Sequence, residues 1–141
     1  MFILIIFPRF LGIKTFVVTS GSMRSIYPVG SLIYVKKVDF NDIVKGDSIT
    51  FYLDDIVATH QVYEIDENKK SFRTQGVDNK DDNGNIIKDA ALVKYSSVIG
   101  KPIFCIYFLG YISKYFWILI IVTAIMLFVN FILEKRKFYE K

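Results

Sequence analysis

The chain has 141 residues, enough for one small domain, and 52% of them are hydrophobic, which is high for a soluble domain. The net charge of +4 owes much to a basic C-terminal tail, so it does not indicate nucleic-acid binding. Cys105 is the only cysteine, which excludes an intrachain disulfide, and with one histidine in the chain it also excludes a His/Cys zinc site. We expect no metal and no cofactor.

The chain opens on an apolar segment, Met1 to Phe7, which Pro8 and Arg9 interrupt. Seven residues are too few to cross a bilayer, and the segment lacks the basic start and small-residue cleavage site of a signal peptide. We therefore predict that residues 1–14 are a partial N-terminal membrane segment, the end of a transmembrane helix that starts upstream. A short segment lying in the membrane interface is the alternative.

Residues 15–105 alternate β-branched and aromatic runs with turn residues, and they show no sustained helical period. The pattern predicts a β-rich domain over this range. Within it we expect strands at 31–37, 48–53, 56–63 and 71–74, turns at 45–47 and 54–55, and a loop at 78–84.

An uncharged apolar run at 115–133 follows the predicted β-rich domain. Its 19 residues would span about 30 Å as a helix, which predicts a transmembrane crossing. We place a membrane-proximal segment and this helix at 106–134 and a basic tail at 135–141. Since basic residues favour the cytoplasmic side, the tail is predicted to be cytoplasmic and the β-rich domain extracytoplasmic.

The clearest catalytic candidates are a serine and the single histidine. Ser22 lies in the sequence Ser20-Gly21-Ser22-Met23, and His60 lies in the predicted strand at 56–63. A serine hydroxyl is a poor nucleophile until a base takes its proton, and imidazole is well suited to that task near neutral pH. If a histidine activates Ser22, it has to be His60. The alternative, a packed histidine and an ordinary turn, is favoured when these residues are considered alone.

Five short blocks follow one another along the chain: Gly12 to Met23 (GIKTFVVTSGSM), Gly30 to Ile33, Lys45 to Asp47, Ala58 to His60, and Thr74 to Asn79. Together they resemble the type I signal peptidases, from about Phe10 to the end of the chain. The closer resemblance is to the endoplasmic-reticulum-type branch, found also in archaea and sporulating bacteria. In that branch a histidine stands where the common bacterial members have a lysine base.

The resemblance implies a membrane-bound serine endopeptidase that removes N-terminal signal peptides from secretory precursors. Ser22 matches the nucleophile and His60 the general base. Asp82 matches the third acid if one loop residue is deleted, with Asp78 second, and Ser20 matches the residue whose hydroxyl joins the Ser22 amide in the oxyanion hole. The implied fold is a mostly-β, signal-peptidase-like domain with a C-terminal transmembrane helix in the cell membrane. Its implied partners are precursors and the lipid bilayer, without nucleic acid.

Three departures from the family pattern stand out. The usual proline two residues after Met23 is absent and comes at Pro28, Gln61 replaces the usual arginine, and the first anchor is truncated. None of these removes a reacting group.

Two other functions stay open. One is a non-catalytic membrane-anchored β module that binds a surface partner, in which the candidate side chains would not converge. The other is a self-cleaving protease of the repressor type. That class uses a lysine base and is normally soluble, so His60 and the apolar run argue against it.

Overall fold

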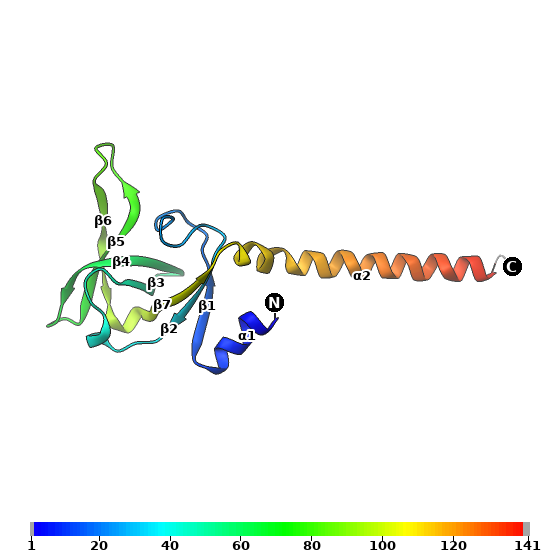
Figure 1. The fold of residues 1–141 in the computed structure, drawn as a ribbon, viewed down its shortest axis with the longest axis horizontal. Coiled ribbons are helices and arrows are strands. Elements are labelled where there is room, and N and C mark those ends of the chain that lie inside the picture. The colour runs from blue at the N-terminus through cyan, green and yellow to red at the C-terminus, as the bar shows by residue number, and fades with distance from the viewer. Residues whose placement is uncertain (1, 140–141) are drawn as a thin grey trace. The chain divides into compact units, whose positions relative to one another are not determined.

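Seven antiparallel strands form one sheet in the order β1-β2-β7-β3-β4-β5-β6 in the computed structural model, which describes residues 2–139 (Figure 1). The prediction of a mostly-β chain is confirmed. The elements in chain order are α1 (Phe2–Phe10), β1 (Ile13–Val17), β2 (Leu32–Lys36), the 3-10 helix η1 (Phe40–Asp42), β3 (Ser48–Leu53), β4 (Ile56–Asp66), β5 (Ser71–Lys80), β6 (Ile86–Lys94), the 3-10 helix η2 (Tyr95–Ser97), β7 (Val98–Ile106) and α2 (Leu109–Tyr139).

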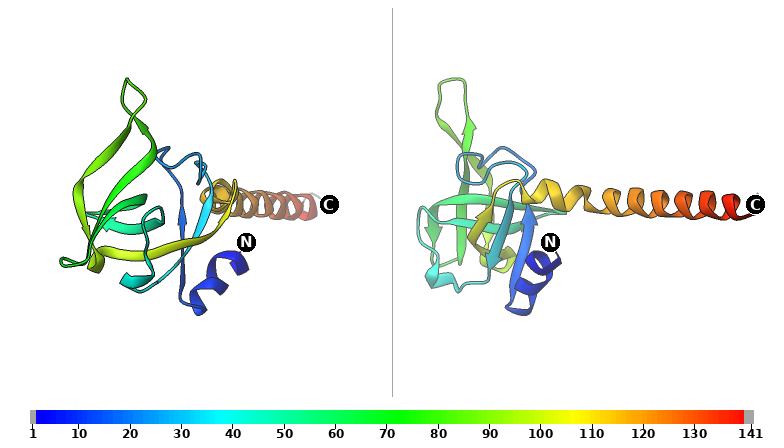
Figure 2. Two further views of the ribbon diagram at one scale, coloured as in Figure 1. Left: turned by 60° about the vertical axis from the view of Figure 1, so that its left-hand side comes forward. Right: turned by 45° about the vertical axis from the view of Figure 1, so that its right-hand side comes forward.

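Strand β7 joins two parts of the sheet, β1 and β2 on one side and β3 to β6 on the other. Its first residues pair with β3 and its later residues pair with β2, and the sheet curls strongly around this junction (Figure 2). Gly100 lies where the two pairings meet, and a Cβ there would lie 2.0 Å from the Lys36 carbonyl oxygen. Only glycine fits this close approach of two backbones.

Two clusters of buried apolar side chains form the core. The larger comprises Ile43, Ile49, Phe51, Val62, Phe72 and Val93, all buried. The smaller comprises Ile33, Val35 and Ile99. Burial of these side chains supplies the main driving force for folding and holds β4 against β3 and β5.

The predicted strands at 31–37, 48–53, 56–63 and 71–74 all correspond to observed strands. The predicted loop at 78–84 is wrong in part, because β5 continues to Lys80. The remaining turn is closed by the Asp81 carboxylate, which accepts hydrogen bonds from the amides of Asn83 and Asn85. Strands β5 and β6 extend beyond the neighbouring strands as a projecting hairpin (Figure 1).

The N-terminal segment is a helix that leads directly into the sheet. Helix α1 ends at Phe10 and β1 begins at Ile13, so residues 13 and 14 belong to the sheet and not to the predicted membrane segment. The hydroxyl of Tyr34 donates to the Leu4 carbonyl over 3.0 Å, which ties α1 to β2.

Residues 111–141 form a compact unit separate from residues 1–110, and most of α2 lies in it. The predicted crossing at 115–133 falls within α2, where most of the apolar side chains that the structure describes are exposed, among them Ile118, Leu127 and Leu133. Among the residues that the structure describes, no helix has the length and hydropathy required to cross a membrane. The structure therefore does not support the predicted transmembrane helix.

Candidate active site

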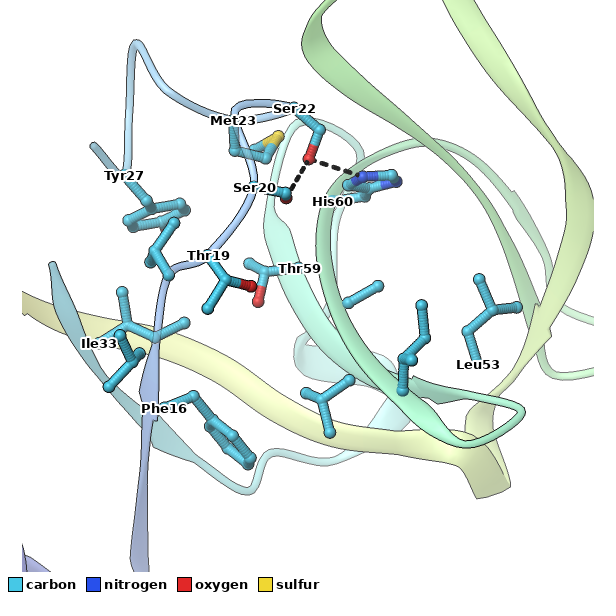
Figure 3. Close-up of a pocket in the computed structure, with 15 residues that line it drawn as sticks. Phe16, Thr19, Ser20, Ser22, Met23, Tyr27, Ile33, Leu53, Thr59 and His60 are labelled. Carbon is cyan, nitrogen blue, oxygen red and sulfur yellow. Dashed lines mark hydrogen bonds between the residues drawn. The ribbon is translucent and has the colours of Figure 1, made fainter. Parts of the chain in front are cut away.

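The structure brings Ser22 and His60 together. The Ser22 Oγ lies 3.1 Å from the Nε2 of His60, a hydrogen-bonding distance, although 37 residues separate them in the chain (Figure 3). Ser22 belongs to the turn that follows β1, and His60 belongs to β4. A serine hydroxyl that donates to a neutral imidazole is the arrangement in which the histidine can take its proton.

The turn that carries Ser22 is held in place by the buried side chain of Met23. Met23 is 2% exposed, and its Sδ accepts a hydrogen bond from the Val77 amide over 3.5 Å. The Arg24 amide donates to the Gly21 carbonyl, which closes the turn. Because Met23 points inward, the neighbouring Ser22 side chain is presented toward β4.

The position of His60 follows from the pairing of β4 with β3. His60 lies opposite Ile49, and its ring meets Phe51 edge-on at 6.3 Å between centroids. The preceding Thr59 bonds to Thr50 through their hydroxyls at 2.9 Å. The imidazole is thus packed on a rigid strand, with 15% of its side chain exposed.

The second ring nitrogen of His60 faces a carboxylate. The Nδ1 lies 2.5 Å from the Oδ2 of Asp89 on β6, and the buried hydroxyl of Thr74 donates to the same oxygen over 2.7 Å. An aspartate that accepts the Nδ1 proton leaves Nε2 free to accept one from Ser22, and it stabilises the imidazolium that forms. Ser22, His60 and Asp89 therefore have the geometry of a serine-protease triad.

The predicted third acids lie elsewhere. Asp78 accepts hydrogen bonds from the amide and hydroxyl of Ser25 and is not bonded to His60. Asp82 lies exposed in the turn between β5 and β6. In the structure Asp89, and neither Asp82 nor Asp78, therefore occupies the position predicted for the third acid.

Two residues of the site were missed from the sequence, Asp89 and Thr74. One signal was available for Asp89, since it is a carboxylate within the largely apolar segment Ile86 to Val93. A half-buried charge of this kind needs a partner, and the only histidine is a reasonable one. Thr74 carries no comparable signal.

Ser20 lies beside Ser22, the predicted nucleophile. Its Oγ is 3.3 Å from the Ser22 Oγ, and Figure 3 shows both serines and His60 converging on one point. The predicted oxyanion-hole hydroxyl is thus beside the predicted nucleophile. In this position it can donate to an oxygen that develops charge next to Ser22.

An apolar cavity of about 470 Å³ opens at this point. Its polar edge is formed by Ser20, Ser22 and His60, and its wall is contributed mainly by apolar side chains of β1, β4 and Met23. Tyr27 also lines it, and burial raises the pKa of its hydroxyl. The cavity can take uncharged side chains next to the serine.

Gly76 of β5 packs directly against Ser22, which gives a first prediction. A Cβ at this position would lie 2.9 Å from the Ser22 Cβ and 2.6 Å from the Asn79 side chain. Gly76→Ala should therefore displace Ser22 and lower kcat by roughly 10- to 100-fold, the order of loss expected for a displacement of this size. Gly21→Ala is the matched control, because its Cβ would meet nothing within 4 Å. Equal activities for the two variants in a peptide-cleavage assay would contradict this.

No protein-family model matches the chain, and no curated protein is significantly similar to it. The resemblance to signal peptidases therefore remains a prediction from short sequence blocks. Within the described part of the chain, no group of three or more His, Cys, Asp or Glu residues is placed to hold a metal ion.

Proposed function

We propose that the chain is a membrane-bound serine endopeptidase that removes signal peptides from secretory precursors. The observation that carries the proposal is the hydrogen-bonded series from Ser22 through His60 to Asp89 at the edge of an apolar cavity. A non-catalytic binding module would not require these three side chains to meet. Their convergence favours the enzyme over the module.

The chemistry proposed for the site is acyl transfer. The Ser22 Oγ attacks the scissile carbonyl while His60 Nε2 takes the hydroxyl proton, and the charge on the carbonyl oxygen is stabilised by the Ser20 hydroxyl and the Ser22 amide. His60 then gives the proton to the departing amine, which leaves an acyl-enzyme on Ser22. Water, deprotonated by His60, hydrolyses this ester and restores the serine.

The free strand edges beside the cavity support an extended peptide as the substrate. β1 is an edge strand of the sheet. β4 pairs with β5 only from Gln61 onward, so the first residues of β4, 56–60, leave a second free edge. Residues of β1 and of 57–59 line the cavity between these two edges. A peptide added as a strand could bond to such an edge while its side chains enter the cavity, and small or apolar side chains suit that wall.

The membrane part of the proposal rests on the sequence of 115–133, which carries no formal charge, and on the exposed apolar side chains along α2. A signal peptide lies in the bilayer before cleavage, so an enzyme held at the surface meets it at high local concentration.

The deciding experiment is cleavage of a signal-peptide reporter by the full chain in membrane vesicles. The expected product begins directly after a site with small side chains, as N-terminal sequencing of the released protein would show. A second reporter with bulky charged residues at that site serves as the control and should stay intact. Absence of cleavage in both would refute the proposed function.

A topology prediction follows from the same proposal. In a Cys105→Ala background, Asn83→Cys should react with a membrane-impermeant thiol reagent on intact cells, because the catalytic domain faces outward. Lys137→Cys should react only after permeabilisation, since the basic tail is placed inside. The reverse labelling pattern would contradict both the orientation and the access to secreted precursors.

A further inference from the structure

The turn that carries Ser22 is attached to β5 mainly at Asp78, beside the hydrogen bond from the Val77 amide to Met23 Sδ. The Asp78 amide donates to the Ser22 carbonyl over 2.9 Å. Its Oδ2 accepts two hydrogen bonds from Ser25, one from the amide at 2.8 Å and one from the hydroxyl at 2.9 Å. Asp78 therefore holds both ends of the segment from Ser22 to Ser25.

Apart from these bonds to β5, the contact of Ser22 with His60 and the burial of Met23, this segment depends on local contacts. It lies in the irregular connection between β1 and β2, outside the ladder pairings of the sheet. Its own bonds are those of a turn, from Arg24 to Gly21 and from Ile26 to Met23. The distance from Ser22 Oγ to His60 is therefore set in large part by how β5 holds the turn.

The negative charge of Asp78 suits its role as a hydrogen-bond acceptor for Ser25. The Ser25 amide and then the Ser25 hydroxyl lower the pKa of the Asp78 carboxyl by bonding to its ionised form, so it carries no proton near neutral pH. Both Ser25 groups are donors, and hydrogen bonds to a carboxylate are stronger than those between neutral groups. Asp78 has no bond to His60, whose Nδ1 is bonded to Asp89.

We propose that Asp78 is a positioning residue that fixes the Ser22 turn for attack by tying Ser25 to β5, without taking part in proton transfer. This inference rests on the proposed function of Ser22. It separates the two acidic residues by role, since Asp89 acts on the histidine and Asp78 acts on the backbone that carries the nucleophile. It also assigns Ser25 a role that the sequence did not suggest.

The test compares Asp78→Ala with Asp78→Asn in the full chain. The alanine variant loses both bonds to Ser25, and kcat for the peptide reporter should fall by roughly 10- to 100-fold. KM should stay within about threefold, because most residues that line the cavity lie outside the segment from Ser22 to Ser25. The asparagine variant keeps a carbonyl oxygen for both Ser25 donors and should restore most of kcat. Ser25→Ala, which keeps the amide donor, should fall between the two.

Asp39→Ala is the matched control for loss of a carboxylate, because Asp39 precedes η1 without a side-chain cap bond and lies outside the site. It should keep the wild-type kcat. A wild-type kcat in Asp78→Ala would overturn the inference. Equal losses of kcat in Asp78→Ala and Asp78→Asn would also overturn it, because they would show that the effect comes from the charge of the side chain.

Amide hydrogen exchange gives a readout that does not depend on activity. In Asp78→Ala the amides of residues 22–26 should exchange faster, with the thermal midpoint of the β domain nearly unchanged, and unaltered exchange would refute the attachment. A failure of the proposed function itself is recognised separately, since wild-type protein would then not cleave the reporter at all.

Discussion

Replacing either Ser22 or His60 by alanine should abolish cleavage of the signal-peptide reporter, with kcat reduced by about 10⁴- to 10⁶-fold. Ser22→Ala removes the attacking oxygen, and His60→Ala removes the only imidazole in the chain, which lies 3.1 Å from that oxygen. The double variant should be no slower than either single variant, because the two groups act in one step. Rates measured with equal amounts of folded protein in vesicles would show this.

The pH profile provides the control for the histidine. Only the neutral ring can accept the Ser22 proton, so the activity of the wild-type chain should fall as the medium is acidified and the imidazole becomes charged. The residual rate of His60→Ala should lack this decrease. Near-normal activity in His60→Ala would show that another base activates the serine and would refute the mechanism.

The strands that the sequence predicted are rich in β-branched and aromatic residues, and each of them contributes buried side chains. In β3, Ile49 and Phe51 are buried, and Asp54 and Asp55 form the turn into β4, so local pattern and tertiary packing agree. β6 lacks this agreement because most of its residues are exposed on both faces, and Val93 is its one buried residue. Its strand conformation comes from pairing with β5, which a local pattern does not reveal.

Ser22 and His60 could be proposed as a pair from the sequence because few residues can perform the chemistry proposed for them. There is one histidine, and the serine lies in a short motif next to a strand. The third acid has no such restriction, since 14 acidic residues are present in the chain. Choosing among them requires the register of β5 and β6, and that register shifts twice between Arg73 and Lys80. The alignment to a family loop therefore pointed to the turn instead of the strand.

The prediction of a transmembrane helix rests on composition and not on packing. An uncharged run of residues predicts a crossing from composition alone, and α2 is indeed helical through 115–133. The helical conformation is equally consistent with other environments for apolar side chains. The thiol-labelling experiment at Asn83 and Lys137 tests directly whether the chain crosses a membrane. Neither the uncharged sequence at 115–133 nor its helical conformation does so.

The second large effect is expected at Asp89. Asp89→Ala should lower kcat by about 10³- to 10⁴-fold, because His60 loses the acceptor that holds its Nδ1 proton and stabilises its charged form. The loss should be smaller than for Ser22→Ala, since the aspartate orients the base and does not attack. Thr74→Val, which removes the 2.7 Å hydrogen bond to Asp89 and leaves the carboxylate in place, should cause a lesser decrease.

The matching change at Asp82 decides between the structure and the family alignment. Asp82→Ala alters an exposed turn residue and should change kcat by no more than about twofold, as surface substitutions usually do. Asp89→Asn adds a stricter test, because it preserves the shape of the side chain but favours the wrong tautomer of His60. If Asp82→Ala were the damaging variant and Asp89→Asn the harmless one, the hairpin of β5 and β6 would have to rearrange in the working enzyme. His60 would then take its charge partner from the turn.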